Sequence, residues 1–244
     1  MVEEKFQIPP LTEDEIRCRL VRIKNKGFVV THRHGPTGVG KTLEDLSGIP
    51  ENNLPGPDHR CYELKSGRKN SQSMLTLFTK SPLPPKANSE LLKRFGYLSV
   101  KGNGRKELHT TVLSSEFNTL KGQLGFKIVI ERDRLVLVSA LGDELGFWDK
   151  ETLRERFETK YPGLLYVKAE SRGRGIREEF WFDEAWFLWD FSFDNFVRLV
   201  REDVIKTDIR IGQYPDGRPH DHGTGFRVMP NKLELCFEHR QRII

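Results

Sequence analysis

Residues 56–68 read GPDHRCYELKSGR, and this stretch decides how the rest of the chain is interpreted. A Pro/Gly turn ends at Asp58, and the residues from position 61 onward have the alternating pattern of a β-strand. Successive side chains of a strand point to opposite faces, so Glu63 and Lys65 are expected on the same face. Asp58, on the preceding turn, can converge on that face.

These residue types in this pattern point to a metal site. Two carboxylates held close together repel each other and favour a shared hard cation with oxygen ligands, so Asp58 and Glu63 predict a magnesium site. An adjacent lysine, here Lys65, can orient or deprotonate a water and stabilise charge on a phosphate. Glu44, on a helix expected just before, offers a third carboxylate. This D…E-x-K arrangement is typical of nucleases, although a Glu-x-Lys pair alone is usually a solvated ion pair.

The rest of the chain alternates between helical and strand patterns, which predicts an α/β or α+β fold around one central mixed sheet. Thr12 and Glu15 form a capping box for a first helix that ends near Gly27. The aromatic-rich run at 180–196 predicts core packing rather than a base-stacking platform. The polar segment 97–122 gives no clear pattern. We expect further helices over 41–48, 88–96 (capped by Asn88), 151–160 and 193–204, and strands over 28–30, 61–65, 74–80, 126–131, 134–140, 164–169, 178–182, 207–212 and 225–229.

The composition favours a globular chain with a basic middle. The 244 residues carry a formal net charge of +5, and residues 59–135 hold 15 Lys and Arg against 6 Asp and Glu. This middle suits a polyanion such as nucleic acid, with a solvated basic face as the alternative. No apolar run approaches the roughly 20 residues of a membrane-spanning helix, and the first residues lack a secretory pattern. The three cysteines are odd in number and far apart, which indicates a reducing cytoplasm.

A second candidate site is Gly35–Thr42, which matches the P-loop pattern G-x-x-x-x-G-K-[ST]. A P-loop would place Lys41 on terminal phosphates and Thr42 on magnesium. However, residues 31–34 separate this motif from the preceding apolar residues, and no later segment supplies a convincing Walker-B strand. The sequence therefore favours a glycine turn that begins a helix, with nucleotide hydrolysis as the alternative.

A third candidate, IRIGQYPDGRPHDHGTGFRV (209–228), places a polar loop between two strands. Arginine reads guanine bidentately in the major groove, and His or Asp can discriminate other base edges. The side chains concerned are Arg210, Arg218, His220, Asp221, His222 and Arg227. One alternative is a zinc site formed with Cys236 and His239, whose spacing matches no standard zinc module. Another is a polar hairpin loop with a satisfied histidine pair.

Taken together, five motifs resemble the MvaI/BcnI restriction endonucleases, which are related to the nicking enzyme MutH. Within this family the likeness is closer to MvaI, and it covers about residues 35–228, with a diverged middle at about 97–195. One departure is the short loop at 215–219. The motifs are GPTGVGKTLEDL (35–46), ENNLPGPD (51–58) with YELK (62–65), LTLFTKSP (75–82), DIRIG (208–212) and HDHGTGFR (220–227).

The resemblance implies a PD-(D/E)xK core within a single domain of two lobes, a mainly catalytic one at about 11–140 and a mainly DNA-recognising one at about 160–244. It implies a monomeric, magnesium-dependent type II restriction endonuclease that cuts double-stranded DNA at CCNGG-type sites, CCWGG for likeness to MvaI, and leaves 5′-phosphate ends. A companion DNA methyltransferase is expected. A MutH-like nicking module and a catalytically silent DNA-binding domain remain alternatives.

The resemblance also implies roles for individual residues. Asp58 and Glu63 would bind the metal, Lys65 would serve the attacking water, and Glu44 would be the carboxylate borne by the helix. Thr79 and Lys80 lie where the catalytic-side strand approaches DNA. The residues that fall where the family reads bases are Asp208, Arg210, His220, Asp221, His222 and Arg227.

Overall fold

The computed structural model describes residues 12–48, 62–100, 102, 104–161, 163–221 and 223–244. The chain divides into two compact units, each assembled from segments that are far apart in sequence. The lobes expected from the sequence, about 11–140 and about 160–244, are contiguous, whereas these units interleave along the chain. Unit 1 comprises Met1–Ser71, Thr159–Phe191 and Phe237–Ile244, and unit 2 comprises Gln72–Glu158 and Ser192–Cys236.

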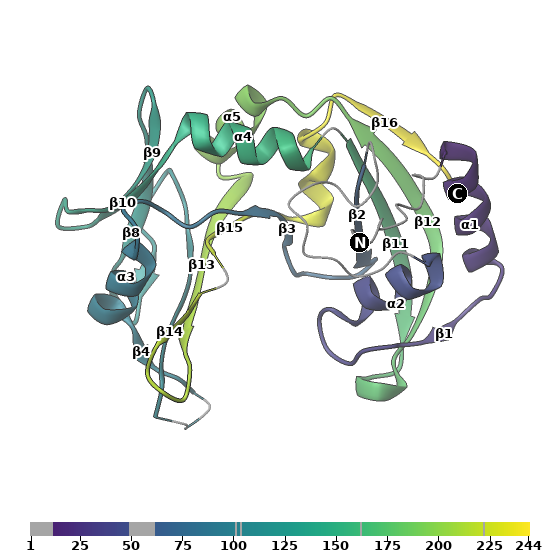
Figure 1. Ribbon diagram of the computed structural model, residues 1–244, viewed down its shortest axis with the longest axis horizontal. Helices are drawn as coiled ribbons and strands as arrows, with labels where there is room; N and C mark the ends of the chain where they lie inside the picture. The colour runs from purple at the N-terminus through teal and green to yellow at the C-terminus, as the bar shows by residue number, and fades with distance from the viewer. Residues whose placement is uncertain (1–11, 49–61, 101, 103, 162, 222) are drawn as a thin grey trace, which may run out of the picture. The chain divides into compact units, whose positions relative to one another are not determined.

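Unit 1 is built on a mixed five-stranded sheet (Figure 1). β2 runs parallel to β11, and the other pairs are antiparallel. In the parallel pair, Glu63 lies beside Leu164, so both strands begin at the same end of the sheet. The strand order is β1 (Val29–Val30), β12 (Glu179–Trp189), β11 (Gly163–Arg172) and β2 (Glu63–Arg68), and β16 (His239–Arg242) also pairs with β12.

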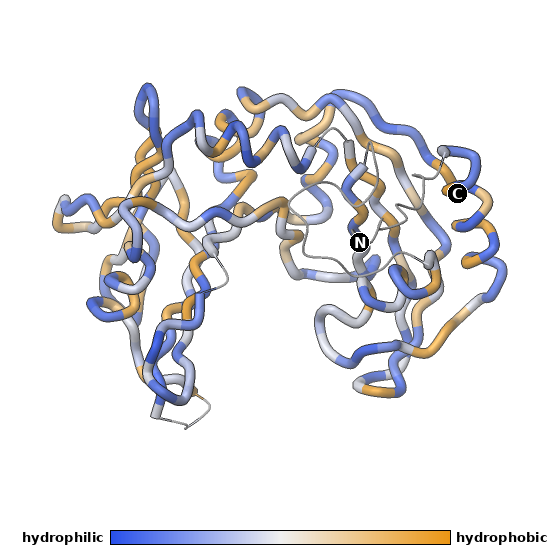
Figure 2. The backbone as a smooth tube through the Cα atoms, in the orientation of Figure 1, coloured by the Kyte–Doolittle hydropathy of each residue, from blue (hydrophilic) through white to orange (hydrophobic). Residues whose placement is uncertain are grey.

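Helices α1 (Glu13–Lys24) and α2 (Gly38–Ser47) pack against one face of this sheet. The predicted capping box is present, because Thr12 Oγ1 accepts from Glu15 N while the Glu15 carboxylate accepts from Thr12 N. Figure 2 shows α1 alternating between blue and orange, as expected of an amphipathic helix that buries one side. The core between helices and sheet includes Ile16, Leu20, Ile23, Val39, Leu43, Leu165, Val167, Phe180, Phe182 and Phe187.

Unit 2 contains a six-stranded antiparallel sheet, a smaller three-stranded sheet and a short two-stranded ribbon. The large sheet has the order β3 (Leu75–Thr79), β15 (Gly225–Val228), β13 (Ile205–Gln213), β5 (Lys106–Val112) and β4 (Tyr97–Leu98), with β14 (Pro219–Asp221) paired to β13. The small sheet has the order β10 (Glu144–Asp149), β9 (Arg134–Ser139) and β8 (Phe126–Ile130), and the ribbon joins β6 (Thr119–Leu120) and β7 (Gln123–Leu124).

Three helices accompany these sheets: α3 (Ala87–Phe95), α4 (Lys150–Lys160), whose last two residues belong to unit 1, and α5 (Phe193–Arg201). Short 3-10 helices cover Gly175–Arg177 and Pro230–Leu235. Aromatic rings pack together in the core of unit 2, where Phe78, Phe196 and Phe226 contact one another. Within the described residues, no helix has the length and apolar character needed to cross a membrane.

The α/β class is confirmed, and so are most of the predicted elements, including the hairpin of β8 and β9. The expectation of one central sheet is wrong, because each unit has its own main sheet. The segment 97–122, which gave no clear pattern, contains β5, an inner strand of the large sheet. Asn88 is not a helix cap: α3 begins one residue earlier, and Asn88 is buried within it. The aromatic run at 180–196 contributes core side chains, as predicted.

The glycine-rich turn before α2 depends on one close backbone approach. A Cβ atom at Gly38, the first residue of α2, would lie 2.2 Å from the carbonyl oxygen of Arg33. A Cβ atom at Gly40, in the same helix, would meet only Ser66 Oγ at 3.9 Å, which is an ordinary contact. Only the first of these glycines is therefore required by space.

We expect Gly38→Ala to lower the free energy of unfolding by about 1–3 kcal/mol, because the added methyl group forces the backbone apart. Gly40→Ala is the matched control and should raise it by up to about 1 kcal/mol, since alanine is the better helix former. Urea denaturation followed by tryptophan fluorescence measures both. Equal changes in the two variants would show that the approach at Gly38 imposes no constraint.

Candidate active site and recognition surface

The D…E-x-K segment lies on β2, at the edge of the unit 1 sheet. Glu63 and Lys65 share one face, as predicted, and Lys65 Nζ donates to Glu63 Oε1 at 2.9 Å. The Glu63 side chain is only 4% exposed and that of Lys65 is 19% exposed. The pair is therefore not the solvated surface ion pair that the motif alone would favour.

A second lysine, which the sequence analysis missed, completes the surroundings of this carboxylate. Lys160 Nζ lies 2.8 Å from Glu63 Oε2, and the Lys160 side chain is 15% exposed. Lys160 is the last residue of α4, and β11 follows it closely in the chain. No local pattern marks Lys160, because its position follows only from the pairing of β11 with β2.

Of the other two predicted carboxylates, the structure describes one. Glu44 is half-buried on α2, which packs against β2, with Gly40 next to Ser66. Asp58 lies outside the described residues. In the part of the chain that the structure describes, no three His, Cys, Asp or Glu side chains gather as a metal-binding group. Glu63 is thus the predicted metal ligand whose surroundings are defined.

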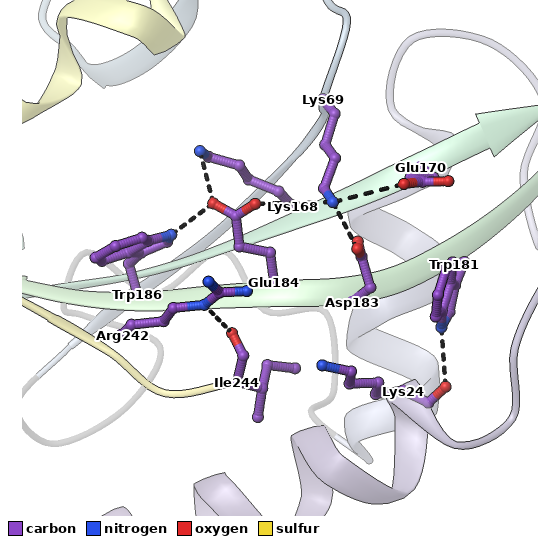
Figure 3. A network of polar contacts seen from close by, with 10 residues as sticks. All are labelled: Lys24, Lys69, Lys168, Glu170, Trp181, Asp183, Glu184, Trp186, Arg242 and Ile244. Atoms are coloured by element: carbon purple, nitrogen blue, oxygen red, sulfur yellow. Dashed lines mark hydrogen bonds and ion pairs between the residues drawn. The ribbon is translucent and has the colours of Figure 1, made fainter.

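The sheet beside Lys65 continues as a polar surface. Tyr166 lies next to Lys65 in register, and burial raises the pKa of its hydroxyl to about 12, with the charge of Glu184 acting in the same direction. Gly67 leaves room for this ring, because a Cβ there would be 2.6 Å from the Tyr166 hydroxyl. Figure 3 shows the next group, in which Glu184 pairs with Lys168 at 2.8 Å and accepts a hydrogen bond from Trp186.

Figure 3 also shows Lys69 among acidic side chains. Its ammonium lies 2.5 Å from Asp183 and 3.7 Å from Glu170. Burial alone lowers the pKa of Lys69, but the hydrogen bond from Lys69 to Asp183 and the nearby acidic charges outweigh it and raise that pKa above its usual value. Lys69 is therefore held as a cation within the fold.

The P-loop-like residues are engaged by the fold itself. Arg68 donates to the carbonyl oxygens of Gly35 and Pro36, and Lys41 pairs with Asp45 at 2.8 Å. The buried Thr42 hydroxyl donates to the carbonyl oxygen of Gly38. The preceding strand, β1, has two residues and is antiparallel to its neighbour, unlike the strand before a P-loop. These contacts favour the glycine turn that begins a helix over a nucleotide site.

The predicted base-reading arginines converge on one buried acid in unit 2. Asp208 on β13 is 2% exposed, and one of its oxygens accepts from Arg210 at 2.5 Å and from Arg227 at 2.7 Å. Its other oxygen accepts from Thr111 at 2.9 Å. Arg227 also donates to the carbonyl oxygen of Met74. Asp208 therefore acts as the anchor that orients two arginines.

The charge state of Asp208 follows from the same contacts. Burial by itself raises the pKa of this carboxyl, but hydrogen bonds from Arg210, Arg227 and Thr111 outweigh it and hold that pKa below its usual value. The arginine that projects further is Arg210, with 52% of its side chain exposed against 18% for Arg227. Thr111 was missed by the sequence analysis because it lies on β5, in the segment without a clear pattern.

The HDHG loop is fastened by contacts within unit 2. The Asp221 carboxylate accepts from Asn88 Nδ2 at 2.7 Å, from Ser81 Oγ at 3.3 Å and from Gly223 N at 2.8 Å. Gly223 has a φ of +80°, so this turn needs a glycine. Asp221 thus shapes the loop. Its neighbour His222 lies outside the described residues.

The remaining residues predicted to contact DNA lie on or next to strands of the large sheet of unit 2. Thr79 pairs with Gly225, and Lys80 N donates to the carbonyl oxygen of Thr224, which ties the end of β3 to the HDHG loop. The ring of His220 lies 4.4 Å from that of Tyr214, and the Arg218 guanidinium lies 5.7 Å from the same Tyr214 ring. Tyr214, which the sequence analysis did not single out, is 43% exposed.

The zinc alternative is not supported by these positions. Cys236 is fully buried, and burial raises the pKa of its thiol to about 12 despite the nearby charge of Arg198. His239 pairs with Asp190 at 3.3 Å, and His220 packs against a tyrosine ring. Among the described residues, Cys236, His220 and His239 do not gather as a metal-binding group.

Comparison with known proteins identifies the relatives of this chain. Residues 18–237 match the family model described as the MvaI/BcnI restriction endonuclease family. The structure described as "Restriction endonuclease MvaI-cognate DNA substrate complex" is similar, with 30% sequence identity, a TM-score of 0.84, and coverage of 96% of this chain and 100% of that chain. "Restriction endonuclease MvaI in the absence of DNA" shows 30% identity, a TM-score of 0.57, and coverage of 97% and 100%. Among curated proteins, no sequence matches significantly. The chain belongs to the MvaI/BcnI restriction endonuclease family.

Proposed function

We propose that this chain is a magnesium-dependent type II restriction endonuclease that hydrolyses both strands of DNA at a CCNGG-type site, with CCWGG as the preferred form. It acts as a monomer and leaves 5′-phosphate ends, and a companion methyltransferase protects the same sites in the host. The observation that carries the proposal is the buried Glu63 carboxylate next to Lys65, in a chain of this family.

The donor set fits a hard cation. Glu63 supplies a buried carboxylate whose two oxygens lie 2.9 and 2.8 Å from the ammonium groups of Lys65 and Lys160, so the site already attracts positive charge. Carboxylate oxygens are the ligands that magnesium prefers. Glu63 and Asp58 would hold the metal.

The chemistry proposed is hydrolysis by in-line attack. The oxygen of a water forms a bond to phosphorus, the bond from phosphorus to the 3′ oxygen breaks, and a proton reaches that leaving oxygen. Magnesium, when bound, supplies Lewis-acid chemistry at the phosphate. Lys65 orients the attacking water and stabilises the growing negative charge, while Glu63 fixes the ammonium of Lys65 by the hydrogen bond described above. Burial of this pair strengthens both interactions.

Base selection is assigned to the arginines that Asp208 anchors. A guanidinium held at a fixed angle can donate two parallel hydrogen bonds to the major-groove edge of guanine. Arg210 and Arg227 differ in exposure and share one carboxylate, so their directions are coupled. Guanines in both halves of a CCNGG site suit such a pair.

We expect an unmethylated supercoiled plasmid with one CCWGG site to become linear when incubated with the protein and Mg²⁺, as gel electrophoresis would show. A plasmid without the site is the control. Open circles alone would favour the MutH-like nicking module, and an unchanged plasmid would favour a silent DNA-binding domain.

We expect Lys65→Ala to reduce cleavage by at least about 10²-fold, because a positioned catalytic group of this kind typically contributes that much. DNA affinity, measured by gel shift in Ca²⁺, should change little. Lys168→Ala is the matched control, since this lysine pairs with Glu184 on the same sheet. Normal cleavage by Lys65→Ala would contradict the assignment of the site.

We expect Arg227→Ala to cost about 1–3 kcal/mol of discrimination at one base position, the usual value of a bidentate arginine contact. Asp208→Asn should weaken discrimination at more than one position, because both arginines lose their anchor. Competition binding with single-base variants of the site measures this. Arg94→Ala, which removes an exposed arginine of the same unit, is the control. A loss that is uniform across all sequences would instead make Arg227 a phosphate contact.

A further inference from the structure

Each carboxylate oxygen of Glu63 lies next to the ammonium group of a lysine. Lys65 makes a directed hydrogen bond to Oε1, whereas Lys160 contacts Oε2 only as an ion pair at 2.8 Å. Among the described residues, no directed hydrogen bond reaches this buried Oε2 atom. The two lysines therefore contact the carboxylate with different geometries.

The register between β2 and β11 brings Lys160 close to Glu63. Leu164, near the start of β11, lies beside Glu63 at the start of β2. The chain segment that enters β11 therefore passes the end of β2 where the carboxylate is buried. α4 ends at Lys160, so its last side chain is the one that reaches Oε2.

We propose that Lys160 is a positioning residue of this site: its ammonium group occupies the place of a cation at Glu63 Oε2 before the metal binds and competes with the metal for that oxygen. The inference rests on the proposed metal-dependent function. A carboxylate this deeply buried is costly without a positive partner, and Lys160 supplies one. A metal that binds the same oxygen is repelled by the ammonium group, so the two cations compete for it.

The proposal separates Lys160 from Lys65. Lys65 is two residues from Glu63 on the same strand and donates to its Oε1 atom. Lys160 reaches Glu63 from a different element, α4. A lysine with a purely structural role would stabilise the fold equally with and without metal, so the metal dependence of stability distinguishes the two roles.

The experiment compares Mn²⁺ binding to the full-length wild type and to Lys160→Met, without DNA. Mn²⁺ is a hard cation that carboxylate sites accept, and free Mn²⁺ can be followed by electron paramagnetic resonance. We expect the affinity to rise at least about fivefold in the variant, the lower end of usual coupling between two sites. The melting temperature of the metal-free variant should fall, and Mn²⁺ should raise it more than in the wild type.

Three further variants sharpen the test. Lys168→Met removes the same charge from unit 1 at a lysine that pairs with Glu184, so its Mn²⁺ affinity should stay at the wild-type value. Lys160→Arg keeps the competing charge and should also bind as the wild type does. Lys160→Gln removes the charge but can still donate to Oε2, so it serves if the methionine variant does not fold.

The outcomes separate this inference from the proposed function. An unchanged or weaker Mn²⁺ affinity in the uncharged Lys160 variants, with normal binding by the wild type, overturns the role of Lys160 alone. An equal gain in Lys168→Met overturns it as well, because the effect would then be general electrostatics. A wild type that binds no Mn²⁺ and cuts no plasmid removes the proposed function and this inference together.

Discussion

The parallel pairing of β2 with β11 is the constraint on which the candidate active site depends. β2 is an edge strand, so β11 is the neighbour that fixes which way its side chains point. A shift of one residue in a strand turns every side chain to the other face, and here it would carry Glu63 and Lys65 to the side covered by α1 and α2. The same register delivers Lys160 to the start of β2. Fold and site are therefore determined by one pairing.

Each unit contains a buried acidic side chain that is paired with two basic side chains. In unit 1, the buried Glu63 is flanked by two lysines, and in unit 2 the buried Asp208 is flanked by two arginines. In both cases the low exposure of the acid makes its partners stay close. Lysine is a compact charge that can give way to a metal, whereas the planar guanidinium keeps a direction that can be used for reading.

The sequence predicted what local patterns carry and missed what long-range pairing decides. The capping box at Thr12 and the shared face of Glu63 and Lys65 follow from spacing along a single element, and both are confirmed. Long-range contacts define the places of Lys160, Thr111 and the buried Asn88 amide. Their partners lie far along the chain, so no local pattern predicts them. β5 was missed because its polar residues show no strand pattern along the chain. It is a strand because it pairs with β13. The roles of Glu44 and Asp58 stay predictions.

The interleaving of the two units has a consequence for the newly made chain. β2 leaves the ribosome long before β11, and β16, which pairs with β12 in the same sheet, emerges later still. Until residues 160–164 are made, Glu63 lacks both its second lysine and the strand that fixes its face. A partly synthesised chain on the ribosome therefore has no assembled candidate active site. Under the proposed function, the order of synthesis delays DNA cleavage until most of the chain has been made.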